Sequence, residues 1–270
     1  MKNRHYIIII LSLLIVGCKN TPQNQDPIPN HDTFKIASKE VKETRIINVW
    51  TPPSYENSSE SFPVLYMPDG GIKEDFPHIA NTLSKLIEEK SIPPMILVGI
   101  ENTKRRRDLT GFSETESDAQ YCPLTDGAKD FRAFITKELF NEIDKRYRTN
   151  TVKGIIGESL AGLFVMETFM LNPELFNFYI AFDPSLWWND HYLVTNSKQL
   201  FEKFPDTEVT LWFAGSSAED ISRYTKELAQ VLKNDAPHKL TWNYSDAPNE
   251  KHHTIFRALK EEALTWTLNK

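Results

Sequence analysis

Residues 157–162 read GESLAG, and this stretch places Ser159 between small residues directly after a short apolar run, residues 154–156. A helical pattern of apolar residues follows it. A serine at a sharp strand-to-helix turn is how an α/β-hydrolase presents its nucleophile, and small residues flank it because the backbone is crowded there. Ala161 departs mildly from the glycine that the motif usually has at that position. The alternative is an ordinary turn whose serine caps a helix, so the rest of the chain has to distinguish the two.

Around this stretch, apolar β-branched segments alternate with segments of helical periodicity. This alternation predicts an α/β-hydrolase fold with a mostly parallel central sheet and helices on both faces. The earliest strands, between residues 34 and 50, have no helix between them and predict an antiparallel edge. A long polar loop is expected at residues 101–126. The strands are expected at residues 45–50, 62–67, 95–100, 154–156, 178–182, 209–213 and 240–244, and the other helices at 79–89, 131–147, 221–232 and 254–268.

The N-terminal segment resembles the signal peptide of a bacterial lipoprotein. Lys2 and Arg4 precede an apolar run, residues 6–16, which is too short to span a bilayer comfortably. Cys18 stands where this run stops, as the lipidated cysteine of a lipobox does. We therefore predict that Cys18 is lipidated and becomes the mature N-terminus; a plain signal peptide or an uncleaved anchor is the alternative.

This interpretation divides the chain into three parts. Residues 1–17 are the expected lipoprotein signal peptide, residues 18–33 a polar, disordered tether, and residues 34–270 a single folded domain. The predicted location is the bacterial cell envelope, where the lipid at Cys18 anchors the domain to a membrane. If Cys18 is lipidated, Cys122 has no intrachain disulfide partner. The net charge of −6 argues against a nucleic-acid partner.

A serine nucleophile needs a base to accept its proton and an acid to orient that base. In α/β-hydrolases the chain order is serine, acid, histidine. Only two of the histidines, His252 and His253, lie between the last expected strand and the last expected helix, where the base of this fold sits. We predict His252 as the base, with His253 as the alternative.

The orienting acid is expected after the strand at residues 209–213. Glu219 and Asp220 both follow it. Because Ser217 and Asp220 have the spacing of a capping box that opens the next helix, Glu219 is the first choice. Asp183 is a third candidate, since it also ends a strand.

An oxyanion hole needs two N–H groups aimed at the developing negative charge. The first is expected from Leu160, the residue after the predicted nucleophile. The second is expected from the loop after residues 62–67, where Gly70 is the first choice and Gly71 is possible. The alternative for this loop is an ordinary Pro-Asp-Gly turn.

Further short blocks follow one another in order from about residue 40 to the C-terminus. They are residues 62–70 (FPVLYMPDG), 102–110 (NTKRRRDLT), 127–134, 147–149, 157–162, 172–176 (NPELF), 184–188 (PSLWW) and 250–254. Together they resemble the Putative esterase (esterase D-like) family, which includes enterobactin and salmochelin esterases and is related to feruloyl and acetyl xylan esterases and to mycolyltransferases. The resemblance implies an α/β-hydrolase fold, carboxylic-ester hydrolysis through an acyl-enzyme, and neither a metal nor an organic cofactor.

Matched to this family residue by residue, Ser159 is the nucleophile and His252 the base. His253 stands where the family commonly has glycine, and Glu158 where it commonly has histidine. Asp183 stands where the family usually has serine, so the resemblance does not favour it as the acid. Some siderophore esterases of this kind work mainly as a Ser–His pair. The resemblance assigns no role to Glu158.

Three residues are candidates for binding the substrate. Arg105 or Arg107 could hold an acidic or catecholate group through planar, bidentate contacts; the alternative is a solvated loop or an ion pair with Asp108. Trp187 could line an acyl-binding or sugar-binding wall. Packing in the core is the alternative, and we expect it for one of Trp187 and Trp188.

The sequence thus predicts a lipid-anchored serine esterase that acts on a small-molecule or glycan ester, such as a siderophore ester or an ester linked to carbohydrate. Two rival hypotheses stay open. An acyltransferase on the same fold would pass the acyl group to a hydroxyl instead of water. A non-catalytic binding lipoprotein would keep the fold to capture a ligand, because a fold does not by itself determine a function.

Overall fold

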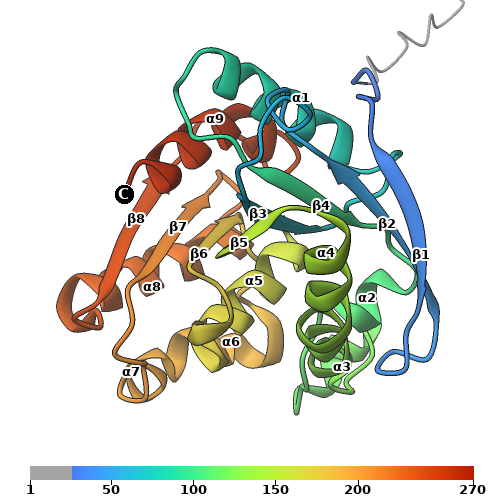
Figure 1. Ribbon diagram of the computed structural model, residues 1–270. Coiled ribbons are helices and arrows are strands. Elements are labelled where there is room, and N and C mark those ends of the chain that lie inside the picture. Colours follow the sequence, from blue (N-terminus) through green and yellow to red (C-terminus); the bar gives the residue numbers. More distant parts are fainter. Residues whose placement is uncertain (1–25) are drawn as a thin grey trace, which may run out of the picture.

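The structure, a computed structural model, describes residues 26–270 and contains one eight-stranded sheet in the order β1-β2-β4-β3-β5-β6-β7-β8 (Figure 1). The strands from β4 onward in this order pair in parallel, whereas β1 and β2 pair antiparallel at one edge. The predicted α/β-hydrolase architecture with an antiparallel N-terminal edge is therefore confirmed. The strands are β1 (Asp32–Ala37), β2 (Thr44–Trp50), β3 (Phe62–Pro68), β4 (Ile96–Ile100), β5 (Thr149–Glu158), β6 (Phe178–Phe182), β7 (Val209–Gly215) and β8 (Leu240–Asp246).

Helices cover both faces of the sheet (Figure 1). They bury the side chains of the sheet in two apolar clusters. One face packs against α1 and α9, and the opposite face packs against α3, α4, α5 and α8. Strands buried on both faces consist of nearly continuous apolar residues, as β4 and β6 do. The helices are α1 (Phe76–Glu88), α2 (Arg105–Asp108), η1 (Glu116–Gln120), α3 (Gly127–Ala133), η2 (Phe134–Leu139), α4 (Phe140–Arg146), α5 (Leu160–Leu171), η3 (Pro173–Leu175), α6 (Trp188–Thr195), α7 (Ser197–Phe201), α8 (Glu219–Asp235) and α9 (Ile255–Leu268).

Two elements differ from the prediction. The single helix expected over residues 131–147 is a longer helical region that begins at Gly127 and contains the π-helical segment η2 between α3 and α4. The polar loop expected at residues 101–126 contains the short helices α2 and η1. Helices of four or five residues are too short to leave a periodic pattern, so the composition of this region indicated only a loop.

The folded domain begins earlier than the predicted residue 34. Strand β1 starts at Asp32, and the residues before it contact the domain. The Arg257 guanidinium donates to Asp26 at 2.6 Å, and the Asn81 amide donates to the Pro27 carbonyl at 2.7 Å. The predicted signal peptide and Cys18 lie outside the described residues. Within residues 26–270, no helix is long and apolar enough to cross a membrane.

The parallel strands place the predicted machinery at one edge of the sheet. Ser159 directly follows β5, Asp183 directly follows β6, and His252 lies between β8 and α9. The carboxyl ends of parallel strands meet at the same edge, which is where open α/β sheets bind their ligands. The loop after β3 joins this edge as well, since β3 is the parallel neighbour of β5.

Candidate active site

Ser159 occupies a strained turn between β5 and α5. Its backbone angles are φ 60° and ψ −119°, a conformation that non-glycine residues rarely adopt. Hydrogen bonds to neighbouring segments hold this turn. The Ser159 N–H donates to the Phe182 carbonyl at 3.0 Å, and the Ser185 N–H donates to the Ser159 carbonyl at 3.1 Å. The turn therefore projects the Ser159 side chain away from the sheet edge in a fixed orientation.

The small residues around Ser159 have a steric cause. A Cβ atom at Gly157 would lie 2.6 Å from the backbone carbon of Ala161, which is closer than such atoms can approach. At Gly162 a Cβ would lie 3.1 Å from the Phe182 carbonyl oxygen. The first turn of α5 thus packs directly on the ends of β5 and β6, and the motif is a requirement of this packing.

Ser159, His252 and Asp183 form a continuous chain of hydrogen bonds. The Ser159 Oγ lies 3.0 Å from His252 Nε2, and the His252 Nδ1 lies 2.7 Å from Asp183 Oδ2. Asp183 is fully buried, and it also accepts hydrogen bonds from the Ser216 N–H at 2.9 Å and the Ser216 hydroxyl at 2.6 Å. A buried, hydrogen-bonded carboxylate fixes the orientation of the imidazole and places a proton on Nδ1.

The predicted acid, Glu219, is not part of this arrangement. Glu219 is exposed at the first position of α8, where an acid interacts favourably with the helix dipole. Asp220 contributes its charge to His252 from a distance, without a hydrogen bond to the imidazole. Asp183 takes the acid position instead, and its φ of 41° turns the chain at the end of β6. The acid thus comes one strand earlier in the chain than we predicted.

The surroundings of His252 favour its protonated form. The hydrogen bond with Asp183 is the main cause that raises the pKa of His252 above its usual value, and burial of the ring opposes this increase. The charges of Glu158, Asp183 and Asp220 raise the pKa further. A base with a raised pKa accepts a proton readily but needs a higher pH to be neutral at rest.

Of the predicted oxyanion donors, the Leu160 N–H is available and the Gly70 N–H is not. Leu160 begins α5, so its N–H has no acceptor within the helix and is available. The Gly70 N–H donates instead to the Ile100 carbonyl at 2.9 Å, and the alternative donor, the Gly71 N–H, donates to the Glu74 carboxylate at 2.7 Å. A Cβ atom at Gly70 would overlap the backbone of β4. Gly70 is therefore a glycine because β4 lies against it, and the prediction of its N–H as a free donor is wrong in this structure.

A cleft of about 480 Å³ opens beside the nucleophile. Its walls come from the loop that contains α2 and η1, from the segment after β6 and from the start of α8. The side chains are a mixture of cationic, aromatic, aliphatic and small polar groups, with one acid, Asp220. They belong to Arg105, Arg106, Tyr121, Cys122, Ser159, Leu160, Ser185, Trp187, Asp220, Ile221, Arg223 and Tyr224.

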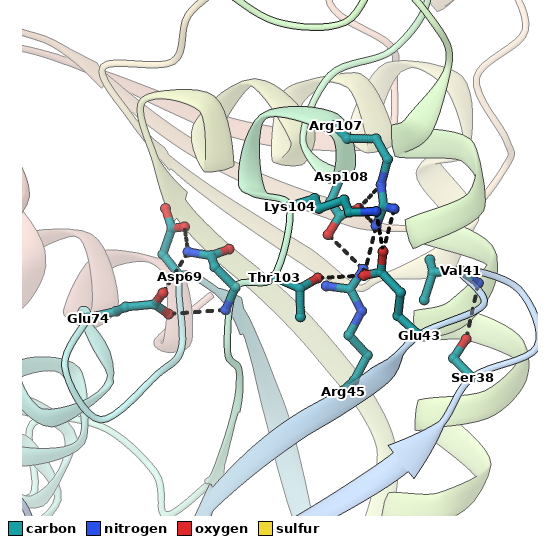
Figure 2. A network of polar contacts seen from close by, with 11 residues as sticks. Ser38, Val41, Glu43, Arg45, Asp69, Glu74, Thr103, Lys104, Arg107 and Asp108 are labelled. Carbon is teal, nitrogen blue, oxygen red and sulfur yellow. Dashed lines mark hydrogen bonds and ion pairs between the residues drawn. The ribbon is translucent and has the colours of Figure 1, made fainter.

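The three consecutive arginines differ in the groups that their side chains contact. Arg105 lines the cleft, but its guanidinium forms two hydrogen bonds of 2.7 Å with Asp69, so its charge is already compensated. Arg107 does not line the cleft. It pairs with Glu43 at 2.7 Å and also contacts Asp108, as Figure 2 shows. The prediction that Arg107 binds substrate is therefore wrong, and the alternative of an ion pair with Asp108 holds.

Two cationic side chains of the cleft were not predicted from the sequence as substrate-binding residues. Arg106 and Arg223 both line the cleft and are exposed, and neither has a carboxylate within ion-pair distance among residues 26–270. Arg106 lies in the arginine run that drew attention to its two neighbours. Arg223 lies in α8, where it looked like any solvated helix residue, so the sequence contained no signal for it.

The two tryptophans also differ. Trp187 lines the cleft, and its ring lies edge-to-face against Tyr121 with 5.1 Å between the ring centres. Trp188 is buried, and its indole N–H donates to the Gly111 carbonyl at 3.1 Å. One tryptophan thus belongs to the wall of the cleft and the other to the core. Cys122 is a free, buried thiol at the cleft, and residues 26–270 contain no cluster of side chains arranged to hold a metal ion.

Known esterases resemble this chain in sequence and in fold. A family model described as Putative esterase matches residues 38–254. The chain belongs to the Putative esterase family. Members of this family are ester hydrolases, and the chain is accordingly an ester hydrolase.

Several relatives of this esterase cover most of its length. It is 23% identical to the ferri-bacillibactin esterase BesA of Bacillus subtilis (strain 168), over 91% of this chain and 92% of that protein. It is 23% identical to the apo-salmochelin esterase of Escherichia coli, over 83% of this chain and 75% of that protein. A solved structure of an IroE-like serine hydrolase from Shewanella oneidensis superposes with a TM-score of 0.82 and is 28% identical, covering 89% of this chain and 80% of that one.

Proposed function

We propose that this esterase is a serine hydrolase that cleaves carboxylic esters through an acyl-enzyme. The observation that carries the proposal is the chain of hydrogen bonds from Ser159 through His252 to the buried Asp183. A serine, a histidine and an acid in this geometry activate the hydroxyl as a nucleophile on several unrelated folds. The cleft beside Ser159 offers space for an ester substrate.

In the proposed reaction, the Ser159 oxygen attacks the ester carbonyl while His252 Nε2 accepts the hydroxyl proton. Asp183 holds the Nδ1 proton and stabilises the imidazolium. The Leu160 N–H donates to the negative oxygen of the tetrahedral intermediate. The carbon–oxygen bond to the leaving group then breaks, and His252 gives its proton to the departing alcohol. Water attacks the acyl-enzyme by the same route, which releases the carboxylic acid and restores Ser159.

The proposal is tested most directly by covalent labelling. A fluorophosphonate probe reacts only with an activated serine, so we expect it to add to the peptide that contains Ser159, as identified by mass spectrometry. Labelling should be lost after heat denaturation, since the activation depends on the fold. Absence of any adduct on the folded protein would contradict the serine mechanism and favour a binding function.

For the substrate, we propose an acidic, aromatic ester such as a siderophore ester. The cleft combines two uncompensated guanidinium groups, Arg106 and Arg223, with the rings of Tyr121, Trp187 and Tyr224. Guanidinium groups bind anionic oxygens through several donors, and aromatic rings stack on planar groups. The names of the relatives, a ferri-bacillibactin esterase and an apo-salmochelin esterase, support a siderophore substrate.

Removal of the two cations should weaken binding of an anionic ester selectively. For Arg106→Gln and Arg223→Gln, we expect KM for 4-acetoxybenzoate to rise about fivefold each, as the loss of a partly exposed charge contact predicts. The KM for the neutral analogue 4-acetoxybenzamide should change less than about twofold, because the amide carries no charge to be paired. Steady-state kinetics on both esters measures this, with Arg146→Gln on the distant end of α4 as the control. Equal losses on both esters would argue against an anion site.

We also propose that Cys18 carries a lipid that anchors the enzyme to a membrane of the bacterial cell envelope. The support is the sequence pattern of residues 1–18. Metabolic labelling with an alkyne fatty acid tests the proposal, since the wild type should incorporate the lipid and fractionate with membranes. Cys18→Ser should do neither, while Cys122→Ser should behave as the wild type.

A further inference from the structure

A second carboxylate, Glu158, lies beside the imidazole of His252. Glu158 is the last residue of β5 and directly precedes Ser159. Its Oε1 atom lies 3.8 Å from His252 Nε2, the same nitrogen that faces the Ser159 hydroxyl. With Asp183 on the opposite ring nitrogen, His252 is held between two acids.

Among the residues that the structure describes, no hydrogen-bond partner explains the position of the Glu158 side chain. Only 19% of the side chain is exposed, yet its carboxylate makes no hydrogen bond within residues 26–270. Its one charged contact within ion-pair distance in that part of the chain is His252. A largely buried carboxylate is costly unless a positive charge compensates it. The positive charge that can appear beside Glu158 is that of the His252 imidazolium.

We propose that Glu158 is a positioning residue that acts through His252: its carboxylate stabilises the imidazolium that forms while Ser159 attacks the ester. The inference rests on the proposed serine mechanism. His252 must be neutral before it can accept the serine proton, and in that state its pair with Glu158 gains little. When His252 accepts the serine proton, the two become an ion pair in a largely buried site. The contact is therefore stronger in the transition state than in the ground state, which is the condition for accelerating the reaction.

The protonation behaviour of the pair agrees with this role. Burial raises the pKa of Glu158 to about 7, and the charge of His252 opposes this rise. Glu158 in turn contributes to the raised pKa of His252, after the hydrogen bond with Asp183. Because the two groups lie 3.8 Å apart, the protonation of one affects the protonation of the other. Activity then requires loss of the shared proton, so the acid side of the pH profile reports on both groups.

Other charged groups around the pair do not replace this contact. They lie in the loop after β3, in α2, after β6 and in α8. Arg105 also attracts the Glu158 carboxylate, but its guanidinium is bound bidentately by Asp69 and lies beyond ion-pair distance of Glu158. The remaining groups are acids that disfavour the Glu158 carboxylate or favour protonated His252. They are Asp69 and Asp75 on the side of Glu158, and Asp183 and Asp220 on the side of His252.

The test is the pH dependence of kcat/KM for the isosteric variant Glu158→Gln. With 4-nitrophenyl acetate, followed at the isosbestic wavelength of the product, the apparent pKa on the acid side should fall by about one unit, because a carboxylate charge 3.8 Å from His252 Nε2 is removed. The rate on the alkaline plateau should fall about tenfold, since the imidazolium loses that stabilisation. Glu158→Asp should retain part of both effects. The matched control is Glu219→Gln, which removes an exposed acid and should leave the profile unchanged.

An NMR titration of His252 on 15N-histidine-labelled protein gives a readout that needs no turnover. We expect the His252 pKa to be lower in Glu158→Gln than in the wild type, and unchanged in Glu219→Gln. An unchanged His252 pKa and an unshifted pH profile would overturn the inference, even if activity fell at every pH. If fluorophosphonate fails to label the wild type, the proposed serine mechanism fails instead, and the NMR titration still decides whether Glu158 and His252 are coupled.

Discussion

Replacement of Ser159 by alanine is expected to lower kcat for 4-nitrophenyl acetate by at least about 10⁴-fold. The reason is geometric. The Ser159 hydroxyl is the one hydroxyl within hydrogen-bond distance of His252 Nε2 in residues 26–270. No other side chain there can therefore replace it in giving a proton to His252. Substrate binding should change little, because alanine leaves the walls of the cleft intact. Initial rates over a range of substrate concentrations separate kcat from KM.

The matched control is Ser217→Ala, which removes an exposed hydroxyl from the segment between β7 and α8. This variant should hydrolyse the ester at the wild-type rate. Thermal melting of both variants shows whether the fold is preserved. If Ser159→Ala kept more than about a tenth of the wild-type rate, the nucleophile would have to be another group and the proposed mechanism would be wrong.

The second large effect is expected for Asp183→Asn, which should lower kcat by about 10³- to 10⁴-fold. An amide in place of the carboxylate no longer stabilises the imidazolium, and its NH₂ group can turn His252 into the wrong tautomer. Since the hydrogen bond with Asp183 is the main cause of the raised pKa of His252, the residual activity should persist to lower pH than in the wild type. A pH profile of kcat/KM measures both changes.

This experiment separates the acid found in the structure from the acid that the sequence favoured. Glu219→Gln should retain at least about half of the wild-type kcat, because Glu219 is exposed at the start of α8. Asparagine can still accept the hydrogen bond from the Ser216 N–H, so Asp183→Asn should remain folded. A large loss in Glu219→Gln with little loss in Asp183→Asn would reverse the assignment.

The nucleophile and the base could be predicted from the sequence because the residues that indicate them are neighbours in the chain. The small residues of the GESLAG stretch are required by neighbouring residues, since a Cβ at Gly157 would collide with the first turn of the following helix. His252 was found because it lies between the last expected strand and the last expected helix. The structure places both residues where they were expected and joins them by a hydrogen bond of 3.0 Å.

The acid that orients His252 could not be predicted from neighbouring residues in the same way. Asp183 and Glu219 both follow a strand, and nothing near them in the sequence tells which of the two faces the histidine. The choice depends on how the loop after β8 folds back over the sheet edge and on the turn with positive φ at Asp183. Family resemblance even disfavoured Asp183, because relatives usually have serine there. The hydrogen bond of 2.7 Å between Asp183 and His252 decides the question.

The amino-acid sequence by itself determined most of the strands and longer helices, their alternation, the sharp turn at Ser159 and the position of His252, because periodicity and backbone sterics act between residues that are neighbours in the chain. Only the tertiary structure decided which acid contacts His252, which acceptor the Gly70 N–H donates to and which of the arginines form ion pairs. Arg105 and Arg107 meet their carboxylates 36 and 64 residues away, at Asp69 and Glu43. An arginine is free to bind a substrate only if folding brings no acid to it, and such distant pairings are fixed when separate strands and loops assemble at one edge of the sheet.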